Sequence, residues 1–346
     1  MVPKEEMTRE FALAVAGCRR AAVVVHTHPD GDALGCAVAM RRYLLSKGKE
    51  VTAIFPDSFP ATLAFLTEGE DLVDASADAA AAARALQECD TLFVLDMNAF
   101  RRAEELAPLL RSCPAGRKVL IDHHLNPAAE EFDTVISVQE ISSACELLFW
   151  LIYGAEGGNI GAMPEKCRYA LMTGMTTDTN NFANSVYPGT LEMSSLLLAS
   201  GVDRDAILAN LYQHYSENRI RAFAALLGED MEILPGGVAV IVAGSAIQKR
   251  FPLAEGETEG LVNIPLGIGD VKISIFVRLE GDCFRVSIRS KRGWSANRLA
   301  AGCFHGGGHE LAAGGKIFIP GDIPSESEAH AFIASCVAQF LQTEHK

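Results

Sequence analysis

The feature that most constrains the fold of this chain is the run Val-Leu-Ile-Asp-His-His at residues 119–124, where a short apolar stretch is followed directly by a carboxylate and two imidazoles. A short apolar run of this kind is typical of a strand buried in a parallel sheet, and such strands present ligands just beyond their carboxyl ends. Two other apolar runs, 22–25 and 91–95, lead in the same way into His26 and Asp96. The sequence therefore predicts a parallel sheet with polar ligands along one edge.

Strand-like and helix-like segments alternate over the first half of the chain. This alternation predicts an α/β fold, a parallel sheet with helices on both faces, because parallel strands are joined by helical crossovers. Strands are expected at 21–25, 51–55, 91–96, 119–122 and 134–137, and helices at 8–18, 33–45, 75–86, 102–111, 142–153 and 164–172.

A length of 346 residues favours two domains over a single core. We expect the ligand-rich strands in a first domain over 1–189, followed by a helical connector over 190–234. A smaller α/β domain is expected over 235–346, with strands near 238–242, 271–278 and 283–288.

Charge and cysteine usage exclude several classes of protein. The formal net charge of −14 argues against a protein that grips long duplex nucleic acid, although it leaves room for a nucleotide bound at metal ions. Nine single cysteines with no Cys-x-x-Cys pair indicate the reduced thiols of a cytoplasmic protein. The longest apolar stretch, around 147–153, is too short for a bilayer, so we expect a soluble protein without membrane association.

One segment of the second domain reverses the charge balance. Residues 272–298 hold seven basic and two acidic side chains, which indicates either a solvated strand face or a surface for an anion. The run His305-Gly306-Gly307-Gly308-His309 follows at once, and three glycines could let several peptide N–H groups approach a phosphate closely. Turns also use glycine, so the run alone is weak support for binding.

The polar residues at the strand ends form a candidate metal site when taken together. They are His26, Asp30, Asp32, Asp96, Asp122, His123 and His124, joined by Asp178 from an expected loop after a helix. Any one of them is more often structural, but so many buried carboxylates without a partner would be very costly. Two divalent cations would balance the four carboxylates of Asp30, Asp32, Asp96 and Asp178. Mixed carboxylate and imidazole ligands favour Mn²⁺ over Mg²⁺ or Ca²⁺, and the absence of cysteine at the cluster argues against a structural zinc.

These residues resemble the motifs of the DHH phosphoesterase superfamily. The run 26–32, His-Thr-His-Pro-Asp-Gly-Asp, resembles its first motif, with Gly35 in the expected following position. Asp96 fits the second motif, Asp122-His123-His124 the third, and Thr177-Asp178-Thr179 the fourth. The run 306–314, Gly-Gly-Gly-His-Glu-Leu-Ala-Ala-Gly, is similar to the signature of the partner domain called DHHA1, so the resemblance covers nearly the whole chain.

Within the superfamily, the length and domain order most resemble the stand-alone nanoRNase/pAp phosphatase branch. Three other branches resemble the chain less. RecJ-type exonucleases carry additional domains, family II pyrophosphatases use another C-terminal domain, and membrane-bound cyclic dinucleotide phosphodiesterases have N-terminal spans that this sequence does not show. Two positions depart from the pattern, since Cys36 stands where Ser is frequent and His305 where Gly is frequent. We expect neither to abolish catalysis, although His305 could alter base contacts.

The resemblance implies a two-metal phosphoesterase, in which His26, Asp30 and Asp96 hold one ion. Asp32, Asp96, His123 and Asp178 would hold the other, so that Asp96 bridges the two. His124 would contact the scissile phosphate and Asp122 would orient its neighbours, completing a catalytic set with Asp96. Substrate contacts would come from Arg289, Ser290, Gly306, Gly307, Gly308 and His309 of the second domain.

The implied substrates are short oligoribonucleotides (nanoRNA), linear dinucleotides such as pApA and pGpG, and pAp, hydrolysed to mononucleotides. A pyrophosphate or polyphosphate hydrolase and a non-catalytic nucleotide-binding protein remain the alternatives. The sequence does not rank the substrates or give the cleavage polarity. It leaves the oligomeric state open, with a homodimer among the options.

Overall fold

The computed structural model describes residues 4–213, 215–254 and 256–344. The chain forms two compact units, Met1–His214 and Tyr215–Lys346. The domain limits expected from the sequence, at 189 and 235, remain a prediction.

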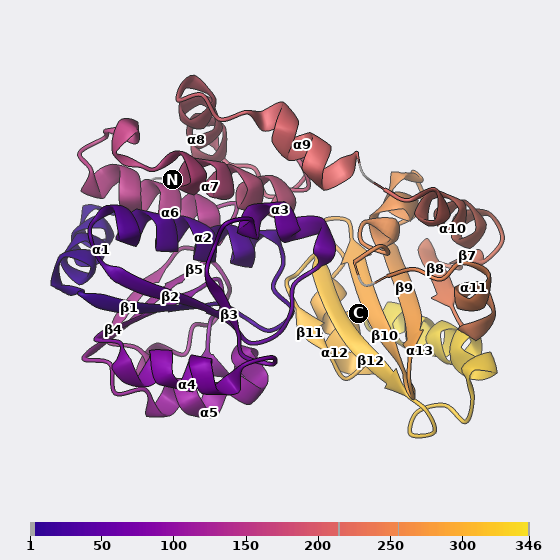
Figure 1. The fold of residues 1–346 in the computed structure, drawn as a ribbon. Helices are drawn as coiled ribbons and strands as arrows, with labels where there is room; N and C mark the ends of the chain where they lie inside the picture. Colours follow the sequence, from indigo (N-terminus) through magenta and orange to yellow (C-terminus); the bar gives the residue numbers. More distant parts are fainter. Residues whose placement is uncertain (1–3, 214, 255, 345–346) are drawn as a thin grey trace. The chain divides into compact units, whose positions relative to one another are not determined.

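The first unit is built on a six-stranded sheet with the strand order β3-β2-β1-β4-β5-β6, in which every neighbouring pair is parallel (Figure 1). Its strands are β1 (Arg20–Val24), β2 (Glu50–Phe55), β3 (Leu72–Asp74), β4 (Thr91–Leu95), β5 (Arg117–Asp122) and β6 (Thr134–Ser137). Its helices are α1 (Glu5–Gly17), α2 (Gly31–Ser46), α3 (Ala64–Thr67), α4 (Ala79–Glu88), α5 (Ala107–Ser112), α6 (Ala144–Ala155), α7 (Glu165–Asp178), α8 (Pro188–Ala199) and α9 (Arg204–Tyr212).

Helices cover both faces of this sheet, as the alternating pattern predicts. Along β1, Val23 packs into the core shared with α1, α2, α6 and α7, whereas Val24 packs into a second core shared with α4 and α5. Both faces of the sheet are therefore buried from water, which explains why the strands are continuous apolar runs. The α/β class and the parallel sheet are confirmed.

The strand order places a topological switch point between β1 and β4. The chain runs outward from β1 through β2 to β3, then returns to the other side of β1 for β4, β5 and β6. Open α/β sheets bind ligands at such a switch point, here at the carboxyl ends of β1 and β4.

The second unit contains another six-stranded sheet, of order β11-β12-β10-β9-β8-β7. Of its pairs only β8 with β9 is parallel. The strands are β7 (Met231–Leu234), β8 (Val238–Ala243), β9 (Ile273–Glu280), β10 (Cys283–Ser290), β11 (Gly307–Gly308) and β12 (Ala312–Phe318). The helices are α10 (Glu217–Gly228), α11 (Ser245–Arg250), α12 (Ala296–Cys303) and α13 (Ala329–Glu344).

Several segments differ from the sequence expectation. The helix expected over 102–111 is a 3₁₀ segment, Phe100–Leu106, followed by the short α5. The expected end of a helix near Met172 is wrong, because α7 continues to Asp178. In its last turns, threonine hydroxyls such as Thr176 Oγ1 donate to carbonyl oxygens one turn back, which lets polar residues continue the helix. Asp178 is thus the last residue of a helix and not part of a loop.

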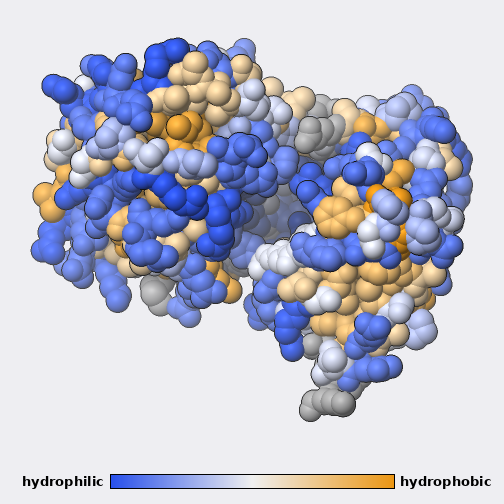
Figure 2. Space-filling model, turned by 90° about the horizontal axis from the view of Figure 1, so that it is seen from below, coloured by the Kyte–Doolittle hydropathy of each residue, from blue (hydrophilic) through white to orange (hydrophobic). Residues whose placement is uncertain are grey.

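The face drawn in Figure 2 is mainly hydrophilic, with apolar patches on both units. Leu13, Leu191 and Ile220 are among the exposed large apolar side chains. Within the described residues, no helix combines the length and the apolar character needed to cross a bilayer.

Candidate metal centre

The loop after β1 brings three ligand-type side chains to the carboxyl edge of the sheet. His26 is buried, and its Nδ1 lies 2.8 Å from the carbonyl oxygen of Thr27, which leaves Nε2 directed at the cluster. Asp30 caps α2, since its Oδ1 accepts from the backbone N–H groups of Asp32 and Ala33 at 3.0 and 3.1 Å. Asp32 follows in the first turn of α2 and is 1% exposed.

The ends of β4 and β5 supply the next ligands. Asp96 follows β4 with a φ of 54°, and its N–H donates to the carbonyl oxygen of Ile121 at 3.1 Å. Asp122 is the last residue of β5 and is fully buried, and His123 and His124 follow it. Asp178 joins them from the end of α7, which packs closely against α2.

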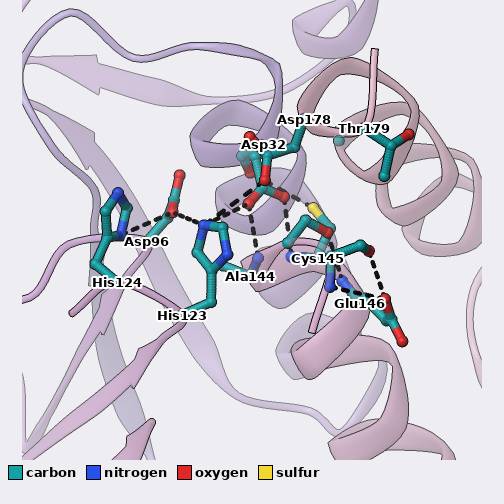
Figure 3. A network of polar contacts seen from close by, with 12 residues as sticks. Asp32, Asp96, His123, His124, Ala144, Cys145, Glu146, Asp178 and Thr179 are labelled. Carbon is teal, nitrogen blue, oxygen red and sulfur yellow. Dashed lines mark hydrogen bonds and ion pairs between the residues drawn. The ribbon is translucent and has the colours of Figure 1, made fainter. Parts of the chain in front are cut away.

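The imidazoles and carboxylates converge in two groups that meet at Asp96. Figure 3 shows the second group, with His123 between Asp96 and the carboxylates of Asp32 and Asp178. In the first, Nε2 of His26 lies 3.5 Å from Oδ2 of Asp96 and 4.0 Å from Oδ1 of Asp30. In the second, Nε2 of His123 lies 3.5, 3.9 and 3.7 Å from carboxylate oxygens of Asp96, Asp32 and Asp178. Such separations are long for hydrogen bonds and suit ligands that share a cation. All six metal ligands expected from the sequence are thus close together.

The hydrogen bonding of Asp96 also fits a cation. Its Oδ1 is buried and accepts no hydrogen bond in the described part of the chain, although His123 Nε2 and His124 Nδ1 lie 3.5 and 3.6 Å away. A buried carboxylate oxygen without a donor is costly unless a cation compensates it. The residues present therefore fit divalent metal ions.

The electrostatics of the cluster point the same way. Burial, with the neighbouring charge of Asp96 next, raises the pKa of Asp32 to about 7, and burial also holds the pKa of Asp178 well above its usual range. Burial opposes a proton on His26 and on His123, but Asp96 and the other nearby carboxylates outweigh it and raise their pKa values to about 9 and about 10. These carboxylates and imidazoles therefore favour bound protons that metal ions would replace.

His124 lies beside Asp96 at the edge of this cluster and makes further polar contacts. Its Nδ1 is 2.7 Å from Oδ1 of Asp122, and its Nε2 is 2.8 Å from Nη1 of Arg102. A guanidinium can only donate, so Nε2 of His124 accepts and Nδ1 carries the proton that Asp122 accepts. Asp122 lies behind His124 and fixes its orientation. Arg102 was not identified from the sequence, where it is one of two adjacent arginines.

Asp32 is held by the N-terminus of α6, a second feature that the sequence analysis missed. The N–H groups of Ala144 and Cys145 donate to its two carboxylate oxygens at 2.7 and 2.9 Å. Ser143 caps this helix, and the buried carboxylate of Glu146 accepts a hydrogen bond from the N–H of Ser142. The spacing Ser-x-x-Glu before an apolar run is the signal that could have identified this capped helix end.

Cys36 and Cys145 pack directly behind Asp32. Both thiols are fully buried with their sulfur atoms 3.4 Å apart, and burial raises the pKa of each. Gly174 leaves room for this pair, since a Cβ there would lie 2.3 Å from the sulfur of Cys145. The departure at position 36 is thus accommodated as a buried thiol beside a second one. The expectation that no cysteine lies at the cluster is wrong, because both thiols lie beside Asp32.

The candidate substrate residues lie on the second unit. Arg289 and Ser290 end β10, and Ser290 Oγ donates to the carbonyl oxygen of Trp294 at 2.6 Å. Two of the three glycine N–H groups already donate within the chain, Gly306 to the carbonyl oxygen of Ala300 and Gly308 to Oδ1 of Asn297.

Close packing explains Gly306 and Gly308 without a ligand, and a Cβ at Gly308 would lie 2.6 Å from the carbonyl oxygen of Ala312. A Cβ at Gly306 would lie 1.9 Å from the carbonyl oxygen of Gly314, and one at Gly315 would lie 2.3 Å from that of Phe304. Gly314 and Gly315 belong to the strand β12, in which they pair with β10. A role of Gly306, Gly307, Gly308 and His309 in substrate binding remains a prediction.

Comparisons with known proteins agree with this geometry. The model of the DHH family, N-terminal domain, matches residues 20–175. The bifunctional oligoribonuclease and PAP phosphatase NrnA of Thermus thermophilus is 28% identical over 306 residues, which cover 85% of this chain and 83% of that protein.

Two solved structures are also similar. An exopolyphosphatase-related protein from Bacteroides fragilis is 31% identical with a TM-score of 0.92, over 100% of this chain and 99% of that chain. An exonuclease RecJ bound to manganese shares the fold, at 16% identity and a TM-score of 0.54 over 99% of this chain and 95% of that one. The motifs, the metal-type cluster at the switch point and these similarities together establish that the chain belongs to the DHH family of phosphoesterases.

Proposed function

We propose that this protein hydrolyses short oligoribonucleotides and pAp to mononucleotides with the help of two divalent metal ions. The observation that carries the proposal is the pair of ligand groups that meet at Asp96. Two metal ions that share a carboxylate are the usual arrangement for phosphoester hydrolysis. The name of the Thermus relative, an oligoribonuclease and PAP phosphatase, supports the substrate class.

In this proposal His26, Asp30 and Asp96 hold one ion, and Asp32, Asp96, His123 and Asp178 hold the other. Such ions, when bound, supply Lewis acidity that activates water and neutralises charge on a phosphate. We favour Mn²⁺ because carboxylate and imidazole ligands are mixed, and a RecJ of the same fold was solved with manganese.

Residues of the chain itself orient the groups that are proposed to contact the phosphate. Asp122 and Arg102 hold the His124 ring from both sides, which fixes the ring toward the cluster. Arg102 adds a permanent positive charge next to that ring, where negative charge develops on the phosphate during hydrolysis. Arg289, Ser290 and His309 of the second unit are proposed to hold the rest of the nucleotide.

The decisive experiment is an assay of the purified protein with Mn²⁺ on pApA, pGpG, pAp, inorganic polyphosphate and single-stranded RNAs of two to twenty nucleotides. We expect turnover of the dinucleotides, pAp and the shortest RNAs, with kcat/KM falling as length increases, because the acidic chain gains little from a long polyanion.

Two outcomes would replace this proposal. Turnover of polyphosphate at the rate of dinucleotides would favour a polyphosphate hydrolase, a possibility raised by the name of the Bacteroides relative. A flat or rising kcat/KM with RNA length would favour a RecJ-like exonuclease. The Asp96→Asn variant serves as the inactive control for contaminating nucleases.

A further inference from the structure

A row of basic side chains crosses one face of the second sheet. In the strand register, Arg285 on β10 stands opposite Arg278 on β9 and opposite Lys316 on β12. Residues directly opposite on antiparallel strands share a face and lie within a few ångströms, so like charges there repel and destabilise the sheet. The row Arg278–Arg285–Lys316 is called the basic row below.

The chain does not neutralise this row. The side chains of Arg285 and Lys316 are exposed and make no ion pair or hydrogen bond within the described part of the chain. Arg278 is half-buried and donates from Nη2 to the carbonyl oxygen of Leu253 at 3.2 Å. Glu280 lies on the same face one step further along β9, and it forms no ion pair with these three among the described residues.

The basic row shares its face with Arg289. Arg285 and Arg289 are four residues apart on β10, so their side chains project to the same side, separated by about 13 Å along the strand. Between them lies a row without charge, formed by Phe276, Ser287 and Gly314. The sheet therefore presents positive charge at two places on one face, an arrangement that complements a chain of phosphates.

We propose that the basic row binds phosphates of a single-stranded oligoribonucleotide beyond the nucleotide held at Arg289. This inference rests on the proposed function and refines its substrate class. A dinucleotide gains nothing from the row, whereas an RNA of a few nucleotides does. Because the row contains only three cations within a chain of net charge −14, its benefit ends after those few nucleotides.

The test compares the double variant Arg285→Gln/Lys316→Gln with the wild type on pApA and on a five-nucleotide RNA. We expect kcat/KM for pApA to stay within about twofold and that for the pentamer to fall about tenfold at low salt. The slope of log kcat/KM against log salt for the pentamer should become less negative by about 1.4, since each contact with a single strand contributes about 0.7.

The matched control is Arg221→Gln/Lys249→Gln, which removes the same charge from exposed positions on α10 and α11. This control variant should have the same kcat/KM as the wild type for pApA and for the pentamer. The thermal midpoint of the Arg285→Gln/Lys316→Gln variant should equal or exceed that of the wild type, because the substitutions remove repulsion across the strands.

An equal loss on pApA and the pentamer, or the same loss in the control variant, would overturn the proposal. If the wild type hydrolysed neither substrate, the proposed function would fail. Fluorescence anisotropy with a labelled pentamer would still test whether the basic row binds RNA. Equal affinity of the wild type and the Arg285→Gln/Lys316→Gln variant for the pentamer would then show that the basic row does not bind RNA.

Discussion

Loading the centre with metal should release protons, and the number of protons follows from the cluster. The neighbouring carboxylates raise the pKa of His26 to about 9 and that of His123 to about 10 in the metal-free protein. Both imidazoles face the cluster through Nε2, so each must lose its proton before it can bind an ion. Metal and protons therefore compete for the same two nitrogen atoms.

The magnitude can be worked out at pH 8. A group with a pKa of about 9 is then roughly 90% protonated, and one with a pKa of about 10 is roughly 99% protonated, so the two imidazoles should release about two protons when both ions bind. Asp178, whose pKa burial holds well above its usual range, would add to that number. The combined binding constant should rise about 100-fold for each increase of one pH unit. Below pH 7 the release should increase further, because the pKa of Asp32 is about 7.

Isothermal titration calorimetry with Mn²⁺, in two buffers of different ionisation enthalpy, measures this release directly. The His123→Gln variant should release about one proton fewer than the wild type at pH 8, because one competing site has been removed. The matched control is His28→Gln, since the His28 ring is 55% exposed and lies 2.8 Å from Asp57. Binding heats that do not depend on the buffer, or equal release from the wild type and His123→Gln, would refute the reasoning.

Three further predictions concern single positions. Asp96→Asn should cost more activity than Asp122→Asn, which should lose only about 10–100-fold because it orients a neighbour, and equal residual activity with unchanged metal content would contradict the bridging role. Arg102→Gln should lower kcat about 100-fold with metal content unchanged, whereas Arg101→Gln, an exposed neighbour with the same charge, should resemble the wild type in the same assays. Gly35→Ala places a methyl group 2.7 Å from a carbonyl oxygen of α7 and should cost about 1–3 kcal/mol of stability, measured by denaturant unfolding.

The metal ligands could be predicted because they directly follow apolar strands. His26, Asp96 and His123 each lie within two residues of a strand end, and parallel strands of one sheet bring such ends to a common edge. Asp178 is predicted in the cluster as part of a polar loop after a helix, and it also fits the fourth motif of the family. Its place at the end of α7 was not foreseen, since its polar neighbours hide a helix whose hydroxyls bond to its own backbone.

The contacts that orient these ligands could not be predicted. Arg102 reaches His124 from a segment 22 positions away in the sequence, and Asp32 accepts from α6 across more than a hundred positions. Such contacts depend on how the crossover segments pack against one another, and the apolar periodicity of the sequence does not indicate that packing. For the same reason the sequence does not show that Gly306 and Gly315 lie where two backbone segments pack closely.

The left-handed backbone at Asp96 has an evolutionary consequence. At a φ of 54° most side chains are strained, and glycine, asparagine and aspartate are the residues that tolerate it best. Of these, only aspartate also brings a carboxylate to the meeting point of the two ligand groups. Without selection for activity, substitution by glycine would be favoured at this position, because glycine relieves roughly 1 kcal/mol of backbone strain. We therefore expect descendants that have lost the activity to carry glycine or asparagine at position 96 and to be no less stable than their active ancestors.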